Sequence, residues 1–132
     1  MSFTTEINTV INADPSLNEY VDGGMHYENL IDNWLADTND NTWIVYEHRK
    51  TEQSNCINNK NIFMTYALSV IVIQRNTNTM IDVITNRLIE YLNNHESGNI
   101  VDIGFKNDQG GFNQQQNIYT NTLEFECVYI ET

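Results

Sequence analysis

The chain has 132 residues, 40% of them hydrophobic and 11% aromatic, which is enough apolar surface to bury one core without disulfides or metals. Six Lys and Arg residues against 18 Asp and Glu give a net charge of −12. A field of this sign repels nucleic acid and anionic lipid, so the sequence excludes a basic binding surface for either. A net negative charge suits a protein that binds basic surfaces, or one that lines a channel through which DNA slides.

The N-terminal segment predicts two short helices. Apolar residues within positions 7–11 recur at helical spacing behind Thr4 or Thr5, either of which can cap a helix start. A second helix is expected to begin with Asp14 as its N-cap and Pro15 at the tolerated first position, and to end at a glycine pair. Both pieces are amphipathic, so each is expected to bury one face.

The next third of the chain mixes helical and strand patterns. Residues 28–37 carry an apolar helical stripe, and residues 38–41 form a turn cluster. Residues 42–48 are rich in β-branched and aromatic side chains and predict a strand, followed by a polar loop over residues 50–60. Residues 62–74 predict a long strand in the middle of a sheet, because their second half is apolar on both faces.

The last part of the chain predicts one long helix and a hairpin. Apolar residues recur every three to four positions from Met80 to Leu92, and residues 76–79 are expected to open that helix. Residues 100–105 predict a strand, and residues 106–116 predict an extended hairpin loop because they are polar and contain glycine. The final run alternates apolar and polar residues with a period of two, which is typical of a half-buried strand.

These elements predict one α+β domain over residues 1–132. Its sheet is expected to be largely antiparallel with about four strands, backed by one main amphipathic helix and short N-terminal helices. The alternation in the final strand predicts that its core face holds Leu123, Phe125, Cys127 and Tyr129, whereas Glu124 and Glu126 face away.

The sequence predicts no catalytic, cofactor-binding or metal site. It contains no phosphate loop, dinucleotide fingerprint, nucleophile elbow or zinc-protease motif. Cys56 and Cys127 lack the spacing of a zinc site, and His26, His48 and His95 lie far apart in the sequence without ligands at metal-binding spacing. The N-terminus carries no basic and apolar leader, and no apolar run is long enough to predict a membrane span.

One enzymatic alternative is a small metal-dependent nuclease. Asp40 precedes Glu47, His48 and Arg49, an order that loosely resembles the acidic pair and cation that hold a metal and a water molecule. Arg49 stands where such a site needs lysine, and no basic surface would hold the substrate. The competing interpretation is that Glu47 and Arg49 form a solvated strand face.

The polar stretch before the final strand has two interpretations. It consists of Asn107, Asp108, Gln109, Gly110, Gly111, Phe112, Asn113, Gln114, Gln115, Gln116 and Asn117. It is either a disordered loop or an arm that becomes ordered against a neighbouring subunit, with Phe112 as its one aromatic anchor. The second interpretation makes these residues an assembly interface.

Several segments, taken in order, resemble the tail-terminator (tail-completion) proteins of long-tailed bacteriophages. They are Leu17–Gly24, which is similar to the family's "Leu…Leu-Val-Gly-Gly" region; Trp43–Tyr46, similar to its "Tyr-Ile-Val-Tyr" strand; the long strand Tyr66–Ile73; the amphipathic helix Met80–Leu92; and the aromatic-rich terminal strand Leu123–Tyr129. The resemblance covers nearly the whole chain. One departure is Thr42, which stands where the family commonly has a proline before its first strand.

The resemblance implies a structural virion protein without enzymatic activity, made in the cytoplasm of a bacterial host. Such a protein forms a homo-oligomeric ring, commonly a hexamer, that docks on the last ring of the tail tube protein and stops its polymerisation. Its other surface meets a head connector, and DNA passes through the ring without sequence-specific binding. Other neck and head-tail connector proteins are also small α+β subunits repeated in a ring, and they remain an alternative. The resemblance implies neither a cofactor nor a membrane.

Overall fold

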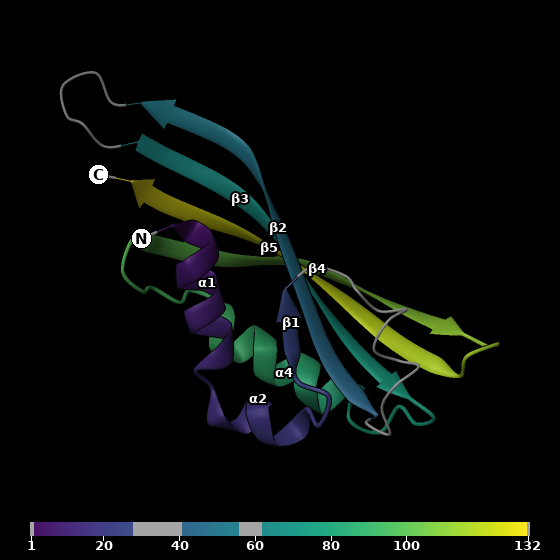
Figure 1. Ribbon diagram of the computed structural model, residues 1–132. Helices are drawn as coiled ribbons and strands as arrows, with labels where there is room; N and C mark the ends of the chain where they lie inside the picture. The colour runs from purple at the N-terminus through teal and green to yellow at the C-terminus, as the bar shows by residue number, and fades with distance from the viewer. Residues whose placement is uncertain (1, 28–40, 56–61, 132) are drawn as a thin grey trace.

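One twisted sheet carries helices on one of its faces in the computed structural model, which describes residues 2–27, 41–55 and 62–131 (Figure 1). The elements in chain order are α1 (Phe3–Asn12), α2 (Pro15–Tyr20), β1 (Met25–Tyr27), β2 (Thr42–Asn55), β3 (Ile62–Arg75), α4 (Ile81–Leu92), β4 (Ile100–Asn113) and β5 (Ile118–Glu131). The strand order is β1-β2-β3-β5-β4. The predicted α+β class with a largely antiparallel sheet is confirmed.

Four strands of 14 residues each form the body of the sheet. β3 is central and pairs antiparallel with β2 on one side and β5 on the other, so that Val70 lies opposite both Tyr46 and Leu123. β4 pairs antiparallel with β5 and forms one edge of the sheet. The short β1, which the sequence analysis missed, pairs parallel with β2 at the other edge.

The main core lies between the sheet and the helices. The sheet contributes fully buried side chains such as Leu68 and Phe125, and α4 contributes Leu88, each at most 2% exposed. α1 adds Ile7 and Ile11, whose side chains have no exposed surface. Because apolar burial is the main favourable term in folding, this layer holds the three helices against the sheet.

The predicted alternation in the final strand is confirmed. Leu123, Phe125, Cys127 and Tyr129 are at most 2% exposed, whereas Glu126 is exposed and Glu124 is half-buried on the opposite face of the sheet. A register slip of one residue would bury two carboxylates, so the alternation fixes the register of β5.

A smaller apolar cluster lies on the opposite face of the sheet. Trp43, Ile73 and Ile118 belong to it, and the guanidinium of Arg75 lies 5.1 Å from the centroid of the Trp43 ring. Gly23 is required beside it, because a Cβ atom there would lie 2.1 Å from Trp43 Nε1. The second half of β3 is therefore apolar on both faces, but on this face only its end beside Trp43 is fully buried.

The helix caps agree only in part with the sequence analysis. Ser2 caps α1, since its Oγ accepts a hydrogen bond from the N–H of Thr5 at 3.2 Å, so the predicted caps Thr4 and Thr5 are wrong. Asp14 caps α2 as predicted, with Oδ1 accepting from the N–H of Ser16 at 3.0 Å. Ser2 precedes both threonines, and its side chain reaches the first unpaired N–H groups of the helix equally well, so α1 begins earlier than predicted.

Two further boundaries differ from the predicted ones. Residues 50–55, predicted as loop, continue β2 because the opposite strand of the hairpin offers a pairing partner for each of them except Thr51, which forms a bulge. Residues 76–79, predicted to open the helix, precede it, since α4 begins at Ile81. The predicted helical segment 28–37 and the rest of positions 28–40 lie outside the described residues.

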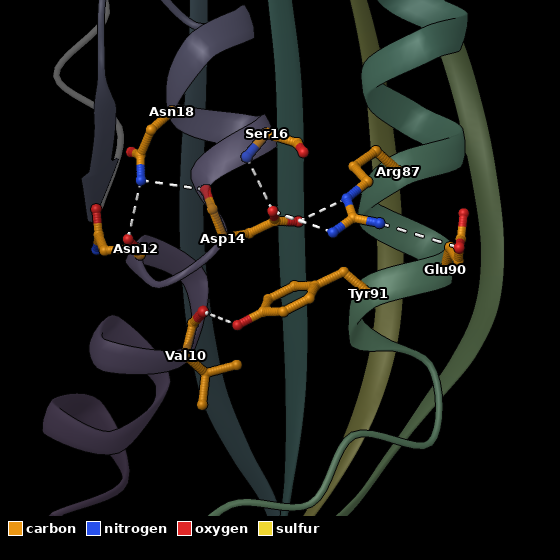
Figure 2. A network of polar contacts seen from close by, with 8 residues as sticks. All are labelled: Val10, Asn12, Asp14, Ser16, Asn18, Arg87, Glu90 and Tyr91. Carbon is orange, nitrogen blue, oxygen red and sulfur yellow. Dashed lines mark hydrogen bonds and ion pairs between the residues drawn. The ribbon is translucent and has the colours of Figure 1, made fainter.

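A polar network fastens the corner between α1 and α2 to α4 (Figure 2). Asp14, 1% exposed, accepts hydrogen bonds from Arg87 Nε at 2.7 Å and from Nη2 at 3.1 Å. Arg87 also approaches Glu90 at 3.9 Å, and the Tyr91 hydroxyl donates to the carbonyl oxygen of Val10 at 2.8 Å. One buried carboxylate therefore caps a helix and pairs with a cation on another helix.

Candidate assembly surface

The predicted interface loop belongs mostly to the sheet. Residues 107–113 form the second half of β4 and pair with residues 118–124 of β5, leaving a turn at positions 114–117. The expectation of an extended loop is therefore wrong over most of its length. Glycine, asparagine and glutamine are poor strand formers, but β5 offers a complete partner strand, and such tertiary context overrides weak β propensity.

The hairpin turn is built from asparagine. Asn113 Oδ1 accepts hydrogen bonds from the N–H groups of Gln115 at 3.1 Å and Gln116 at 3.2 Å. Asn117 has a φ of 52°, in the left-handed region that asparagine tolerates better than most residues. These two asparagines are the local signal from which the turn could have been predicted.

The outer half of the hairpin projects as an arm. Every residue from Lys106 to Asn117 is exposed, and the hairpin extends past the helices at one end of the sheet (Figure 1). The side chain of Phe112 is 52% exposed, and its ring lies 4.5 Å from that of Tyr119 on the opposite strand. The arm thus presents one largely exposed aromatic ring, that of Phe112, beside the half-buried ring of Tyr119.

Polar contacts anchor the base of this arm to the body. Asn121 Nδ2 donates to Thr85 Oγ1 on α4 at 3.0 Å and to Asp108 Oδ2 on β4 at 3.3 Å. Asn121 is 6% exposed, and its bond to Thr85 is shielded from water, whereas its bond to the exposed Asp108 is only partly buried. The arm therefore leaves the body at a fixed position, which a disordered loop would not.

The open face of the sheet holds a shallow depression of about 400 Å³. Glu47, Arg49, Ser69 and Glu124 line it, and Ser69 Oγ donates to both carboxylate oxygens of Glu124, at 2.8 and 3.0 Å. These residues come from β2, β3 and β5. Asp40, the other member of the predicted nuclease site, lies outside the described residues.

The three histidines lie in separate places. His26 Nε2 is 2.8 Å from the carbonyl oxygen of Gly23, and His48 Nε2 is 3.0 Å from Thr4 Oγ1. The ring centroid of His95 lies 5.2 Å from that of Tyr91 on α4. Among the described residues, no group of three or more His, Cys, Asp or Glu side chains could hold a metal ion.

Cys127 is buried in the core face of β5. Burial, with smaller contributions from the nearby carboxylates of Asp102 and Glu126, raises the pKa of the Cys127 thiol to about 12. The thiol is thus protonated at neutral pH and a poor nucleophile. Cys56 lies outside the described residues.

The geometry defines an α+β domain with one helix-covered sheet face and a rigid, projecting β-hairpin. No helix in the described part of the chain is long and apolar enough to cross a membrane.

No protein-family model matches the chain, and no curated protein does. Among solved structures, the chain is similar to one in "Virion of native gene transfer agent (GTA) particle", with a TM-score of 0.65 and 11% sequence identity. The match covers 95% of this chain and 92% of the other. An identity of 11% shows a shared fold alone, and the coverage shows that this fold extends over nearly the whole of both chains.

Proposed function

We propose that this chain is a structural, non-enzymatic component of a bacteriophage-like virion. The observation that carries the proposal is the end-to-end fold match to a chain of a gene transfer agent virion, which leaves little of either chain unmatched. The projecting hairpin supports it, because an ordered arm with an exposed aromatic ring, that of Phe112, is suited to contact between subunits.

Within the virion, we assign the chain to the head-proximal end of the tail as a tail-terminator ring. The order of sequence segments that resembles this family supports the assignment, and a neck or head-tail connector ring is the second candidate. Its partners would be further copies of itself, six in a ring, the tail tube protein and a head connector. The excess of 18 acidic over six basic residues suits a ring through which DNA slides without sticking.

Two measurements test this proposal. Sedimentation of the purified protein is expected to show a closed oligomer at high concentration, and imaging of particles from the producing cell is expected to place the protein at the junction of head and tail. A protein that stays monomeric and is absent from purified particles would contradict the proposal. A ring located elsewhere in the neck would favour the second candidate.

Replacing Phe112 by alanine is expected to weaken assembly more than it destabilises the fold. Loss of its ring contact with Tyr119 costs the monomer about 0.5–1.5 kcal/mol. An aromatic anchor at the centre of an interface contributes about 2 kcal/mol or more, which is roughly a 30-fold weaker association. Sedimentation measures association, and thermal unfolding measures the fold.

The matched control for Phe112 is Val83→Ala. Val83 is 44% exposed on α4, away from the hairpin, so its truncation is expected to change neither association nor unfolding. Equal association of the Phe112→Ala variant and the unmodified protein would show that the arm is no interface.

A further inference from the structure

Among the described residues, the two edges of the sheet are open over part of their length. In the described part of the chain, no backbone hydrogen bond from outside the hairpin reaches residues 106–113 of β4, here called the β4 edge. At the other side, β1 covers only residues 44–46 of β2. Apart from β3, no described element has a backbone hydrogen bond to residues 49–55, here called the β2 edge. Unpaired edges of this length are ready templates for another strand.

We propose that, in the ring assigned above, the β4 edge of each subunit pairs with the β2 edge of the next, so that one sheet runs through the ring. This inference rests on the proposed ring and adds its interface. Strand directions favour it. β2 and β5 run one way and β3 and β4 the other, so a second copy in the same orientation places its β2 antiparallel to the first copy's β4.

This geometry produces a ring rather than a two-fold dimer. The two edges are different surfaces on opposite sides of the subunit, so their contact is head-to-tail and repeats until the rotation closes. Pairing of β4 with a second β4 would instead require a two-fold axis and would stop at two subunits.

Pairing the middles of the two edges gives a strand tilt close to that of a closed barrel. Gln109 pairs with Thr122 of β5, which in turn pairs with Ile71 of β3. Glu52 pairs with Thr65 of β3, which lies six residues from Ile71 along that strand. Placing Gln109 beside Glu52 of the next copy therefore shifts that copy along the strands by six residues, or roughly 20 Å at about 3.3 Å per residue. Across the strands, one copy is separated from the next by four strand spacings of about 4.8 Å each. The resulting strand tilt of roughly 46° is close to the roughly 35–45° found in closed barrels.

Local composition also favours this pair of edges. Gly110 and Gly111 lie within the β4 edge, and glycine in a strand often marks a place where another backbone approaches closely. The β2 edge holds Arg49, Lys50 and Glu52, a net charge of +1 in a chain of charge −12. Two copies of such a chain repel each other, and the repulsion is weakest where cations line the contact.

Disulfide trapping tests the interface. Gln109 and Glu52 are both exposed on the same face of the sheet, so Gln109→Cys and Glu52→Cys are combined in one chain, with Cys56→Ser to remove a competing thiol. Buried Cys127 is retained because burial raises the pKa of its thiol to about 12. Mild oxidation is expected to give a ladder of covalent multimers that collapses on reduction, and each single variant is expected to give no ladder.

The outcomes separate this inference from the proposed function. Rings that sediment normally but give no ladder would overturn the edge pairing and leave the ring proposal standing. Covalent dimers from Gln109→Cys alone would also overturn it, because they indicate a β4-to-β4 contact. A protein that remains monomeric at all concentrations would overturn the ring proposal and this interface with it.

Discussion

Replacing Phe125 by alanine is expected to lower the free energy of unfolding by about 3–5 kcal/mol, the usual cost of removing a fully buried phenylalanine. The side chain is 2% exposed and faces the helices from β5, and its ring centroid lies 5.5 Å from that of Phe105 on the neighbouring strand. Truncation leaves a cavity that the surrounding long strands, held by pairing on both sides, cannot collapse to fill. Urea denaturation measures the loss.

The neighbouring residue Glu124 provides the matched control. It lies on the opposite face of the same strand, where it accepts hydrogen bonds from Ser69. Glu124→Ala removes those half-exposed bonds and is expected to cost only about 1 kcal/mol. Equal losses in the two variants would mean that the faces of β5 are assigned the wrong way round.

Replacing Asp14 by alanine is expected to destabilise the protein by about 3 kcal/mol. The change removes a helix cap, which costs about 1 kcal/mol, and breaks a buried ion pair with Arg87, which costs about 3–5 kcal/mol when both charges are buried. Arg87 is 35% exposed, so the charge left behind regains water and the total stays near the lower end. Asp14→Asn keeps a capping side chain and is expected to lose about 1 kcal/mol less.

The same pair predicts how stability depends on pH. Burial by itself raises the pKa of Asp14, but hydrogen bonds from Arg87 and from the N–H of Ser16, together with the positive charge of Arg87, hold it below its ordinary value. A carboxylate with a lowered pKa stabilises the fold above its unfolded pKa of about 4, and this contribution disappears as the pH falls further.

The stability gap between the unmodified protein and Asp14→Asn is the quantity to measure. We expect it to be complete at about pH 6 and to shrink below about pH 4, because the protonated carboxyl then resembles the amide. Using the gap removes the effect of the other carboxylates, which titrate in both proteins. A gap that stays constant down to about pH 2 would show that the Asp14 charge contributes nothing.

The similarity to a gene transfer agent virion chain and the open sheet edges lead to different experiments. The first concerns where the protein resides, and imaging of particles decides it. The second concerns how copies meet, and disulfide trapping decides it. The Phe112 variant connects the two, because it alters the arm and leaves the core intact.

The sequence determined the elements whose side chains carry a regular pattern. The period of two in β5, the both-sided apolar character of β3 and the helical stripe of α4 are local signals, because each reflects which face of an element is buried. Asp14 before Pro15 likewise fixed the start of α2. These elements were enough to predict the α+β class and the antiparallel sheet.

Only the tertiary structure decided the features that depend on a distant partner. Residues 107–113 are polar and glycine-containing, and they form a strand because β5 pairs with them. β1 exists because β2 offers an edge to a three-residue segment, and the Asp14 to Arg87 pair joins residues 73 positions apart. Backbone pairing and long-range ion pairs leave no periodic signal in the sequence, so the arm and the two open edges could be found only in the folded chain.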